Sequence, residues 1–155
     1  MSESAHGAVE SAQALAERVA QAMFASDHAS RALGMHIVAV SPGYAQLSMQ
    51  VRADMVNGHA LCHGGLIFTL ADSTFAFACN SYNFVTVAAG CTIEFLAPAH
   101  EGDVLTATGQ ERAQAGRSGI YDIDVRNGAG ELIAVFRGKS ARIKGHVVAS
   151  LDSSA

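Results

Sequence analysis

Residues 62–82 are the stretch that most constrains how this chain can fold. The run CHGGLIFTLADSTFAFACNSY is almost wholly apolar and long enough for one helix. A helix that is apolar on nearly every side has to be buried. Gly64 and Gly65 stand near its start, and Asp72 stands in its middle, where a carboxylate is far from water. We therefore expect the rest of the chain to wrap around this helix.

The segments on both sides of the helix alternate at period two. Apolar residues at 35, 37 and 39 and at 45, 47, 49 and 51 flank a Pro42–Gly43 turn, which predicts a β-hairpin. Residues 52–62 lose this period and contain Asn57–Gly58, which indicates a loop. After the helix, alternation predicts four further strands, within 85–95, 104–112, 121–125 and 132–143.

The N-terminal region is predicted to be helical. Apolar positions at helical spacing indicate an amphipathic helix from Val9 to about Asp27, followed by a short helix in 28–34 that Gly34 ends. Short turns between strands imply an antiparallel sheet. The prediction is an α+β hotdog fold, a curved antiparallel sheet around a central helix. It is one domain over 1–155, with an N-terminal helical segment (1–30), a core (31–145) and a tail (146–155).

Composition excludes several functional classes. Of the 155 residues, 50% are hydrophobic and 15% charged, as in a compact globular protein, and a net charge of -4 offers no basic surface to nucleic acid. The three cysteines lack CxxC spacing, which argues against a disulfide framework and favours a reducing compartment. We expect neither a signal peptide nor a membrane span, and we expect a cytoplasmic protein.

Helical geometry divides the central helix into two faces. One is a narrow stripe of small or polar residues: Gly65, Thr69, Asp72, Ser73, Ala76 and Asn80. The other would pack on the sheet: Ile67, Phe68, Ala71, Phe75 and Ala78. Small residues let another surface approach closely. We expect that surface to be the same helix of a second copy.

Asp72 is the most informative residue of the helix. Burial of an unpaired carboxylate is costly, and desolvation should raise its pKa. Such acids in clefts are often functional. The structural alternative is a carboxylate paired at a subunit interface or hydrogen-bonded to Thr69 or Ser73.

The start of the helix supplies a second candidate group. The first backbone N–H groups of a helix have no partner inside it, and together with the helix dipole they suit a carbonyl oxygen that acquires negative charge. Gly64 and Asp72 are eight residues apart, or ~12 Å along one helix. One substrate carbonyl cannot touch both. If both act on one carbon, they must come from two subunits with antiparallel helices.

Other candidates have simpler interpretations. His59, Cys62 and His63 could bind a metal, although loop and cap roles are the simpler interpretation. A Cys62–His63 nucleophile pair is disfavoured because adjacent side chains rarely point at one place. Some aromatic residues, Phe68 among them, could line an acyl pocket. A basic cluster could hold phosphates or could simply be solvated: Arg137, Lys139, Arg142 and Lys144.

Several segments of the chain resemble one enzyme family. The runs NGHALCHGG and LADSTFAFACNS, followed by GCTIEFLAPA, GDVLTATGQER, GIYDIDV and AVFRGKSARI, are similar to the phenylacetic-acid-degradation (PaaI-type) hotdog thioesterases. The resemblance covers roughly residues 31–145. It implies hydrolysis of aryl-acetyl-CoA thioesters, especially ring-hydroxylated phenylacetyl-CoA, without a metal or other cofactor. It also implies homodimers that pair into homotetramers.

The resemblance also implies roles for individual residues. The acidic catalytic residue of the family falls on Asp72, the backbone N–H that polarises the thioester on Gly64, and a polar residue that places substrate or water on Asn57. His63 matches a histidine that braces the loop, and Ser73 a small hydroxyl residue. We add Gly65, Ser73 and Phe68 as substrate contacts and Arg137 and Lys139 as contacts for the CoA phosphates. Leu66 departs from the glutamine often found at its position.

Two questions stay open at this stage. Asp72 could act as a general base toward water or could attack the thioester carbon itself. The alternatives to a thioesterase are a hotdog acyl-CoA hydratase or dehydratase, for which His63 is the only plausible acid–base residue, and a non-catalytic acyl-CoA-binding protein.

Overall fold

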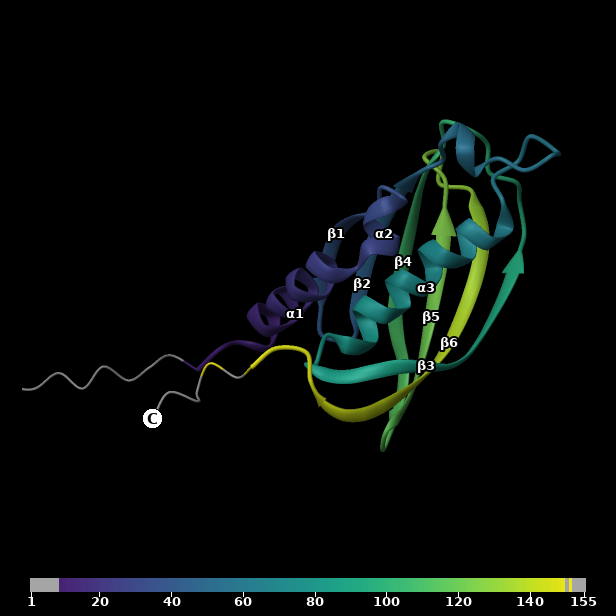
Figure 1. Cartoon of the computed structure of the whole chain (residues 1–155). Coiled ribbons are helices and arrows are strands. Elements are labelled where there is room, and N and C mark those ends of the chain that lie inside the picture. Colours follow the sequence, from purple (N-terminus) through teal and green to yellow (C-terminus); the bar gives the residue numbers. More distant parts are fainter. Residues whose placement is uncertain (1–8, 150, 152–155) are drawn as a thin grey trace, which may run out of the picture.

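The structure is a computed structural model that describes residues 9–149 and Leu151. It contains a six-stranded antiparallel sheet and a long central helix, α3 (Figure 1). The elements in chain order are α1 (Ala12–Ser26), α2 (His28–Ala32), β1 (His36–Ser41), β2 (Tyr44–Gln50), a 3-10 turn (Ala53–Met55), α3 (Gly64–Asn80), β3 (Phe84–Phe95), β4 (Val104–Ala115), β5 (Ser118–Arg126) and β6 (Leu132–His146). The predicted order of helices and strands is confirmed.

The sheet curves around α3, with strand order β1-β2-β4-β5-β6-β3 (Figure 1). Every neighbouring pair of strands is antiparallel. Alternate residues of β2, β4, β5 and β6 point inward onto α3, which explains the period of two in their sequences. Four residues of the predicted inward face of α3 are buried, Ile67, Ala71, Phe75 and Ala78. Phe68, the fifth, is half-buried and packs against the same core. The observed architecture is the predicted hotdog.

One glycine lets α3 approach the sheet closely. Gly138 lies in β6 below the ring of Phe75, and a β-carbon at residue 138 would lie 2.7–2.8 Å from three atoms of that ring. Phe75 is fully enclosed, since it also packs on Tyr121 and Phe136 at ring-centroid distances of 5.6 and 6.0 Å. The helix-to-sheet distance at this point therefore depends on the missing side chain.

The structure corrects the predicted start of the first helix. Val9 is 83% exposed and precedes α1, which begins at Ala12. Ser11 is the N-cap, and its hydroxyl accepts a hydrogen bond from the Ala14 N–H (3.0 Å). The buried face of α1 begins only with Ala16. Residues 1–8 of the predicted N-terminal segment lie outside the described residues, as does most of the predicted tail after Ala149.

Irregular strand pairing explains why some residues lie on the other sheet face from the one that the alternation predicts. The register of β1 on β2 shifts between Ile37 and Ala39, so Ala39 is exposed although it was predicted to share a face with Ile37. The pairing of β3 with β6 shifts between Ala88 and Gly90 in the same way. Ala89 consequently leaves the buried face, while Cys91 stays half-buried.

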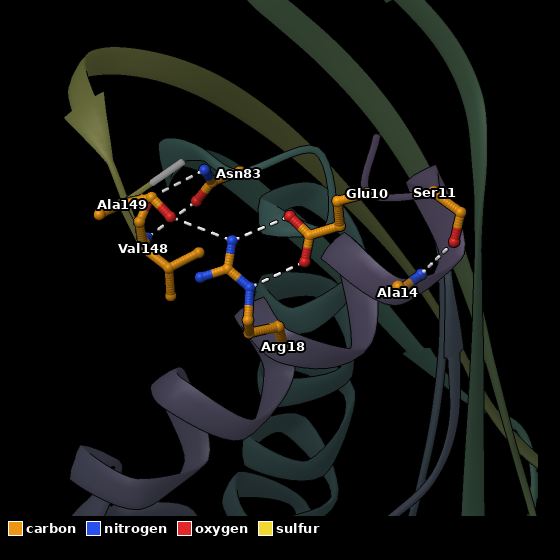
Figure 2. Close-up of polar contacts among 7 residues, drawn as sticks. All are labelled: Glu10, Ser11, Ala14, Arg18, Asn83, Val148 and Ala149. Carbon is orange, nitrogen blue, oxygen red and sulfur yellow. Dashed lines mark hydrogen bonds and ion pairs between the residues drawn. The ribbon is translucent and has the colours of Figure 1, made fainter. Parts of the chain in front are cut away.

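The two ends of the described chain are fastened at one corner of the molecule (Figure 2). The Arg18 guanidinium of α1 donates two hydrogen bonds to the Glu10 carboxylate (2.8 and 2.9 Å) and one to the Ala149 carbonyl (3.0 Å). The Asn83 side chain, just after α3, exchanges two hydrogen bonds with the Val148 backbone (2.8 and 2.9 Å). Helix α1 is thereby held to the chain end that follows β6. No helix in residues 9–149 is long and apolar enough to cross a membrane.

Replacement of Gly138 by alanine tests the close approach of α3. We expect Gly138→Ala to lower the free energy of unfolding by about 1–3 kcal/mol, because the enclosed Phe75 ring has no space to move into. Urea unfolding at fixed protein concentration measures the loss. The matched control is Gly128→Ala in the β5–β6 turn, where a β-carbon meets nothing within 4 Å. Equal stabilities of the two variants would contradict this account of the packing.

Candidate active site

The start of α3 leaves one backbone donor free. His63 is the N-cap, and its Nδ1 accepts a hydrogen bond from the Gly65 N–H (2.9 Å). The His63 carbonyl accepts from the N–H groups of Leu66 (2.9 Å) and Ile67 (3.3 Å). The Gly64 N–H, by contrast, has no acceptor among the described residues. The cap therefore uses the donors next to Gly64 and leaves that one available to a ligand.

An apolar pocket of about 430 Å³ opens beside Gly64. Asn57, Ile67 and residues 95–99 contribute to its walls. The half-exposed ring of Phe95 lies so close that a β-carbon at residue 64 would be 3.1 Å from it. A side chain at this position would crowd the Phe95 ring, whereas glycine fits beside it. Gly64 thus permits a close approach to the backbone at the start of the helix.

Asn57 shapes the loop that forms one wall of the pocket. Its Oδ1 accepts hydrogen bonds from the N–H groups of His59 (2.9 Å) and Leu61 (3.2 Å). Its own N–H donates to the Leu61 carbonyl (2.8 Å). The side-chain amide NH₂ is the part of Asn57 that remains for a ligand in the pocket.

Asp72 is half-buried in the middle of α3, and burial raises the pKa of its carboxyl group. Among the described residues, its side-chain hydrogen-bonding partner is Cys91 of β3, whose Sγ lies 4.0 Å from Asp72 Oδ1. Neither hydroxyl of the structural alternative reaches it. Thr69 donates to the Gly65 carbonyl (2.8 Å), and Ser73 Oγ lies 2.8 Å from Ser30 Oγ of α2. The carboxylate is thus desolvated and only weakly hydrogen-bonded within the described chain.

Gly64 and Asp72 do not meet within one chain. The pocket beside Gly64 is lined from the first turn of α3, whereas Asp72 lies two turns further along the helix, beside Cys91. Eight helical residues span ~12 Å. The expectation that one chain holds the two groups apart is consistent with this placement.

The predicted stripe of small and polar residues is narrower than expected. Asn80 is 5% exposed, and its side chain bonds to the Thr86 N–H (2.9 Å), the Thr86 carbonyl (3.0 Å) and the Ala76 carbonyl (2.9 Å). It fastens the end of α3 to β3. Ser73 likewise faces α2. The open part of the stripe consists of Gly65, Thr69, Asp72 and Ala76.

The remaining candidates point away from the open stripe. Phe68 packs edge-on against Phe136 with ring centroids 5.3 Å apart. Arg137 donates two hydrogen bonds to Asp122 (2.6 and 2.8 Å), and Lys139 is exposed two residues later. Both cations alternate with inward-facing Phe136 and Gly138, so they occupy the sheet face that points away from α3.

The His59, Cys62 and His63 group does not form a metal site. Within residues 9–149 no group of three or more histidine, cysteine or acidic side chains is arranged to hold a metal ion. His63 caps α3 through Nδ1, and Cys62 is buried, which raises the pKa of its thiol. Sequence reasoning missed Phe95 and Cys91. The only signal for Phe95 was a large apolar residue at a strand end close to Pro98.

Comparison with known proteins identifies the family. The model of the thioesterase superfamily matches residues 59–134, a range that includes both Gly64 and Asp72. The acyl-coenzyme A thioesterase PaaI of Escherichia coli is 48% identical over 128 residues, which are 83% of this chain and 91% of the relative. This chain belongs to the PaaI-type thioesterases. A putative esterase from Archaeoglobus fulgidus is 34% identical over 83% of the chain and 84% of its own length.

Solved structures agree with membership of the PaaI-type thioesterases. The E. coli PaaI structure, from the phenylacetic acid degradation operon, superposes with a TM-score of 0.86 at 47% identity. The alignment covers 88% of this chain and 99% of the E. coli chain. A variant of the phenylacetic acid degradation protein PaaI from Thermus thermophilus superposes with a TM-score of 0.71 at 33% identity. The alignment covers 74% of this chain and 97% of the Thermus chain. The hotdog expected from the periodicities is therefore the fold of this family.

The raised pKa of Asp72 predicts a pH-dependent stability. Because the folded carboxyl has a higher pKa than the unfolded one, the folded state binds the extra proton. Stability therefore falls as pH rises through the window between the two pKa values, and the penalty is complete above the folded-state pKa. Asp72→Asn cannot ionise, so we expect it to unfold at a higher temperature than the wild type at pH 7. The difference should disappear in acid.

Asp122→Asn is the control with the opposite sign. The Arg137 guanidinium lowers the pKa of the Asp122 carboxyl, so its ionised form stabilises the folded state. We expect Asp122→Asn to lose stability at pH 7 and to match the wild type in acid. Thermal unfolding of both variants across a pH series tests the two signs together. A drop in stability at pH 7 for Asp72→Asn would show that its carboxylate is well paired after all.

Proposed function

We propose that this protein is an acyl-CoA thioesterase that hydrolyses aryl-acetyl-CoA thioesters, such as phenylacetyl-CoA and its ring-hydroxylated forms, to the free acid and CoA. The observation that carries the proposal is the Gly64 N–H, a free donor at a helix start that opens beside an apolar pocket. The name of the E. coli relative supports the reaction, and its operon supports the aryl-acetyl group. CoA is part of the substrate, and the mechanism uses no cofactor.

The active form in this proposal is a homodimer with two shared sites. Strand β3 is an edge of the sheet (Figure 1), is 12 residues long, and carries a single charged residue, Glu94 near its end. Natural sheets normally protect such edges with charge or proline, so an open uncharged edge favours pairing with another strand. Antiparallel pairing of β3 with its copy would place the open stripes of two α3 helices side by side. We further propose that two dimers form a tetramer and that the enzyme acts in the cytoplasm.

Each residue then has a role in one shared site. The Gly64 N–H of one subunit binds the thioester oxygen, and Asp72 of the other takes a proton from water as the water oxygen attacks the carbonyl carbon. The carbon–sulfur bond breaks, CoA leaves as a thiolate, and the acid is released. Alternatively, Asp72 attacks the carbon to form a mixed anhydride that water then opens. His63 holds the loop and Asn57 orients water or substrate.

Substrate contacts complete the proposal. Gly65 offers a close approach to the acyl chain, while Phe68 belongs to the apolar surroundings of the site. Residues Arg137 and Lys139 remain the candidates for the CoA phosphates, although Asp122 already neutralises the first. Ser73 is tied to α2, which makes a direct substrate contact less favourable than a positioning role.

The geometry of His63 weighs against a hydratase or dehydratase. Its Nδ1 is occupied by the Gly65 N–H, so in the neutral ring the proton is on Nε2 and the lone pair is not free to act as a base. A binding protein without activity would not require a desolvated acid at position 72. If the acyl-CoA gained a double bond and no free thiol was released, the hydratase or dehydratase reaction would be favoured instead.

Asp72→Asn tests the catalytic assignment. We expect kcat to fall by roughly 10²- to 10⁴-fold while the variant stays folded, because water loses its base or the carbonyl its nucleophile. Thiol release from phenylacetyl-CoA, its hydroxylated forms and straight-chain acyl-CoAs measures both activity and specificity. An active Asp72→Asn variant would remove Asp72 from the mechanism. Single-turnover hydrolysis in ¹⁸O-water, with the label sought in the Asp72 carboxylate, separates nucleophile from base.

A mixed dimer tests the shared site. Asp72→Asn subunits lack the acid, and Gly64→Val subunits carry a side chain that crowds the ring of Phe95 beside the N–H. Each variant alone should be inactive. A hybrid dimer contains one site with both groups intact, so an equal mixture should regain about a quarter of wild-type activity after exchange of subunits. No recovery in verified hybrids would mean that Gly64 and Asp72 do not act in the same shared site.

A further inference from the structure

A partly buried chain of hydrogen bonds connects α2 to the turn of α3 that carries Asp72. Ser30 of α2 is 1% exposed. Its hydroxyl lies 2.6 Å from Asp27 Oδ2 and 2.8 Å from Ser73 Oγ, and its N–H donates to Asp27 Oδ1 (3.0 Å). Asp27, the N-cap of α2, therefore holds Ser30 at two points. The chain ends on the residue that follows the candidate catalytic acid.

The direction of these hydrogen bonds follows from their chemistry. A carboxylate has no hydrogen to donate, so the Ser30 hydroxyl donates to Asp27. Since that hydroxyl has one hydrogen, its oxygen accepts the hydrogen of Ser73. The Ser73 hydroxyl hydrogen is thus committed to α2. A role for Ser73 through position, rather than through substrate contact, follows from this geometry.

The contacts on the two sides of Asp72 differ greatly in strength. Among the described residues, the side chains of 66–79 in α3 make two hydrogen-bonding contacts with other helices or strands. These are the bond between Ser73 and Ser30 and the 4.0 Å contact of Asp72 with Cys91. Successive residues of a helix point about 100° apart. Ser73 therefore faces α2 while Asp72 faces β3. The short bond on the α2 side is the closer of these two polar contacts, and it adds to the packing of Ala71 and Phe75 in holding the rotation of this turn.

We propose that Ser30 and Asp27 are positioning residues that act through Ser73 to hold the Asp72 carboxylate in its working orientation. This inference rests on the proposed function of Asp72. The segment that supplies them precedes residues 59–134, the part of the chain that the family model matches. Asp27 and Ser30 then support the candidate catalytic acid from α2 and its N-cap, through the bond to Ser73.

The segment is anchored well enough to serve as a fixed support. Ala16, Val19 and Ala20 of α1 are buried, and Phe24 packs on Phe77 of α3 with ring centroids 6.3 Å apart. The position of Ser30 is consequently set by contacts that are independent of Ser73.

Kinetics of Ser30→Ala, Ser73→Ala and the double variant test the proposal. We expect each to lower kcat about tenfold and to leave KM within about twofold, since a misplaced catalytic group lowers the rate without weakening ground-state binding. The double variant should be no slower than either single one, because both interrupt the same chain. An unchanged kcat in Ser30→Ala overturns the proposal, and so do additive losses.

Arg18→Met is the matched control. It removes the bonds of α1 to Glu10 and Ala149 but leaves Ser30 and Ser73 in place. We expect it to lower the unfolding temperature while kcat stays close to that of the wild type. If Arg18→Met lowers kcat as much as Ser30→Ala, general loosening of the N-terminal segment explains both results and the specific role is refuted.

Amide hydrogen exchange separates failure of this inference from failure of the proposed function. An inactive wild-type enzyme with every acyl-CoA would refute the thioesterase proposal alone. In that case the orientation of the Asp72 turn is still measurable. Faster exchange at residues 70–76 in Ser30→Ala, but not in Arg18→Met, supports the positioning contact. Equal exchange in Ser30→Ala and the wild type overturns it.

Discussion

The contact of Phe75 with the backbone at Gly138 is the constraint on which the site depends. It brings α3 against the concave face of the sheet and leaves the ring enclosed among aromatic neighbours. With one face of the helix buried in this way, the opposite face is directed outward as the open stripe that contains Asp72. The same packing carries the first turn of α3 to the mouth of the apolar pocket, where Gly64 meets Phe95. The geometry of the candidate site follows from packing of the helix on the sheet.

The fold was largely predictable because its signals are local. A stretch with apolar residues on every side must be buried, and strands that alternate must have one buried face. The errors lie where strand pairing, rather than the local sequence, decides which face of the sheet a residue occupies. Ala39 follows a register shift in β1, and Ala89 lies within one in β3, so each leaves the side that the period of two assigns. The start of α1 was missed because the N-cap contact of Ser11 outweighs the apolar character of Val9.

The candidate site was predictable only in part. Asp72 and Gly64 are conspicuous in the sequence, since an acid within an apolar helix and glycines at its start each need an explanation. Cys91 and Ser30 gave no such signal. Each meets α3 from a segment 19 or 43 residues away, and only the folded chain brings them to the two sides of the Asp72 turn. The prediction that Asn80 belongs to the open stripe was wrong for the same reason, because the partner of Asn80 is the backbone of Thr86 on β3.

The polar groups of α3 divide into those that are satisfied and those that are left free. His63 satisfies the Gly65 N–H, Asn80 fastens the far end, and Ser73 is bonded to Ser30. Between them, the Gly64 N–H lacks an acceptor and Asp72 has only a distant thiol, within the part of the chain that the structure describes. Free polar groups are costly unless they gain a partner in function. The two free groups are also those that one chain holds too far apart to use together, so the arrangement favours completion by a second copy of the same helix.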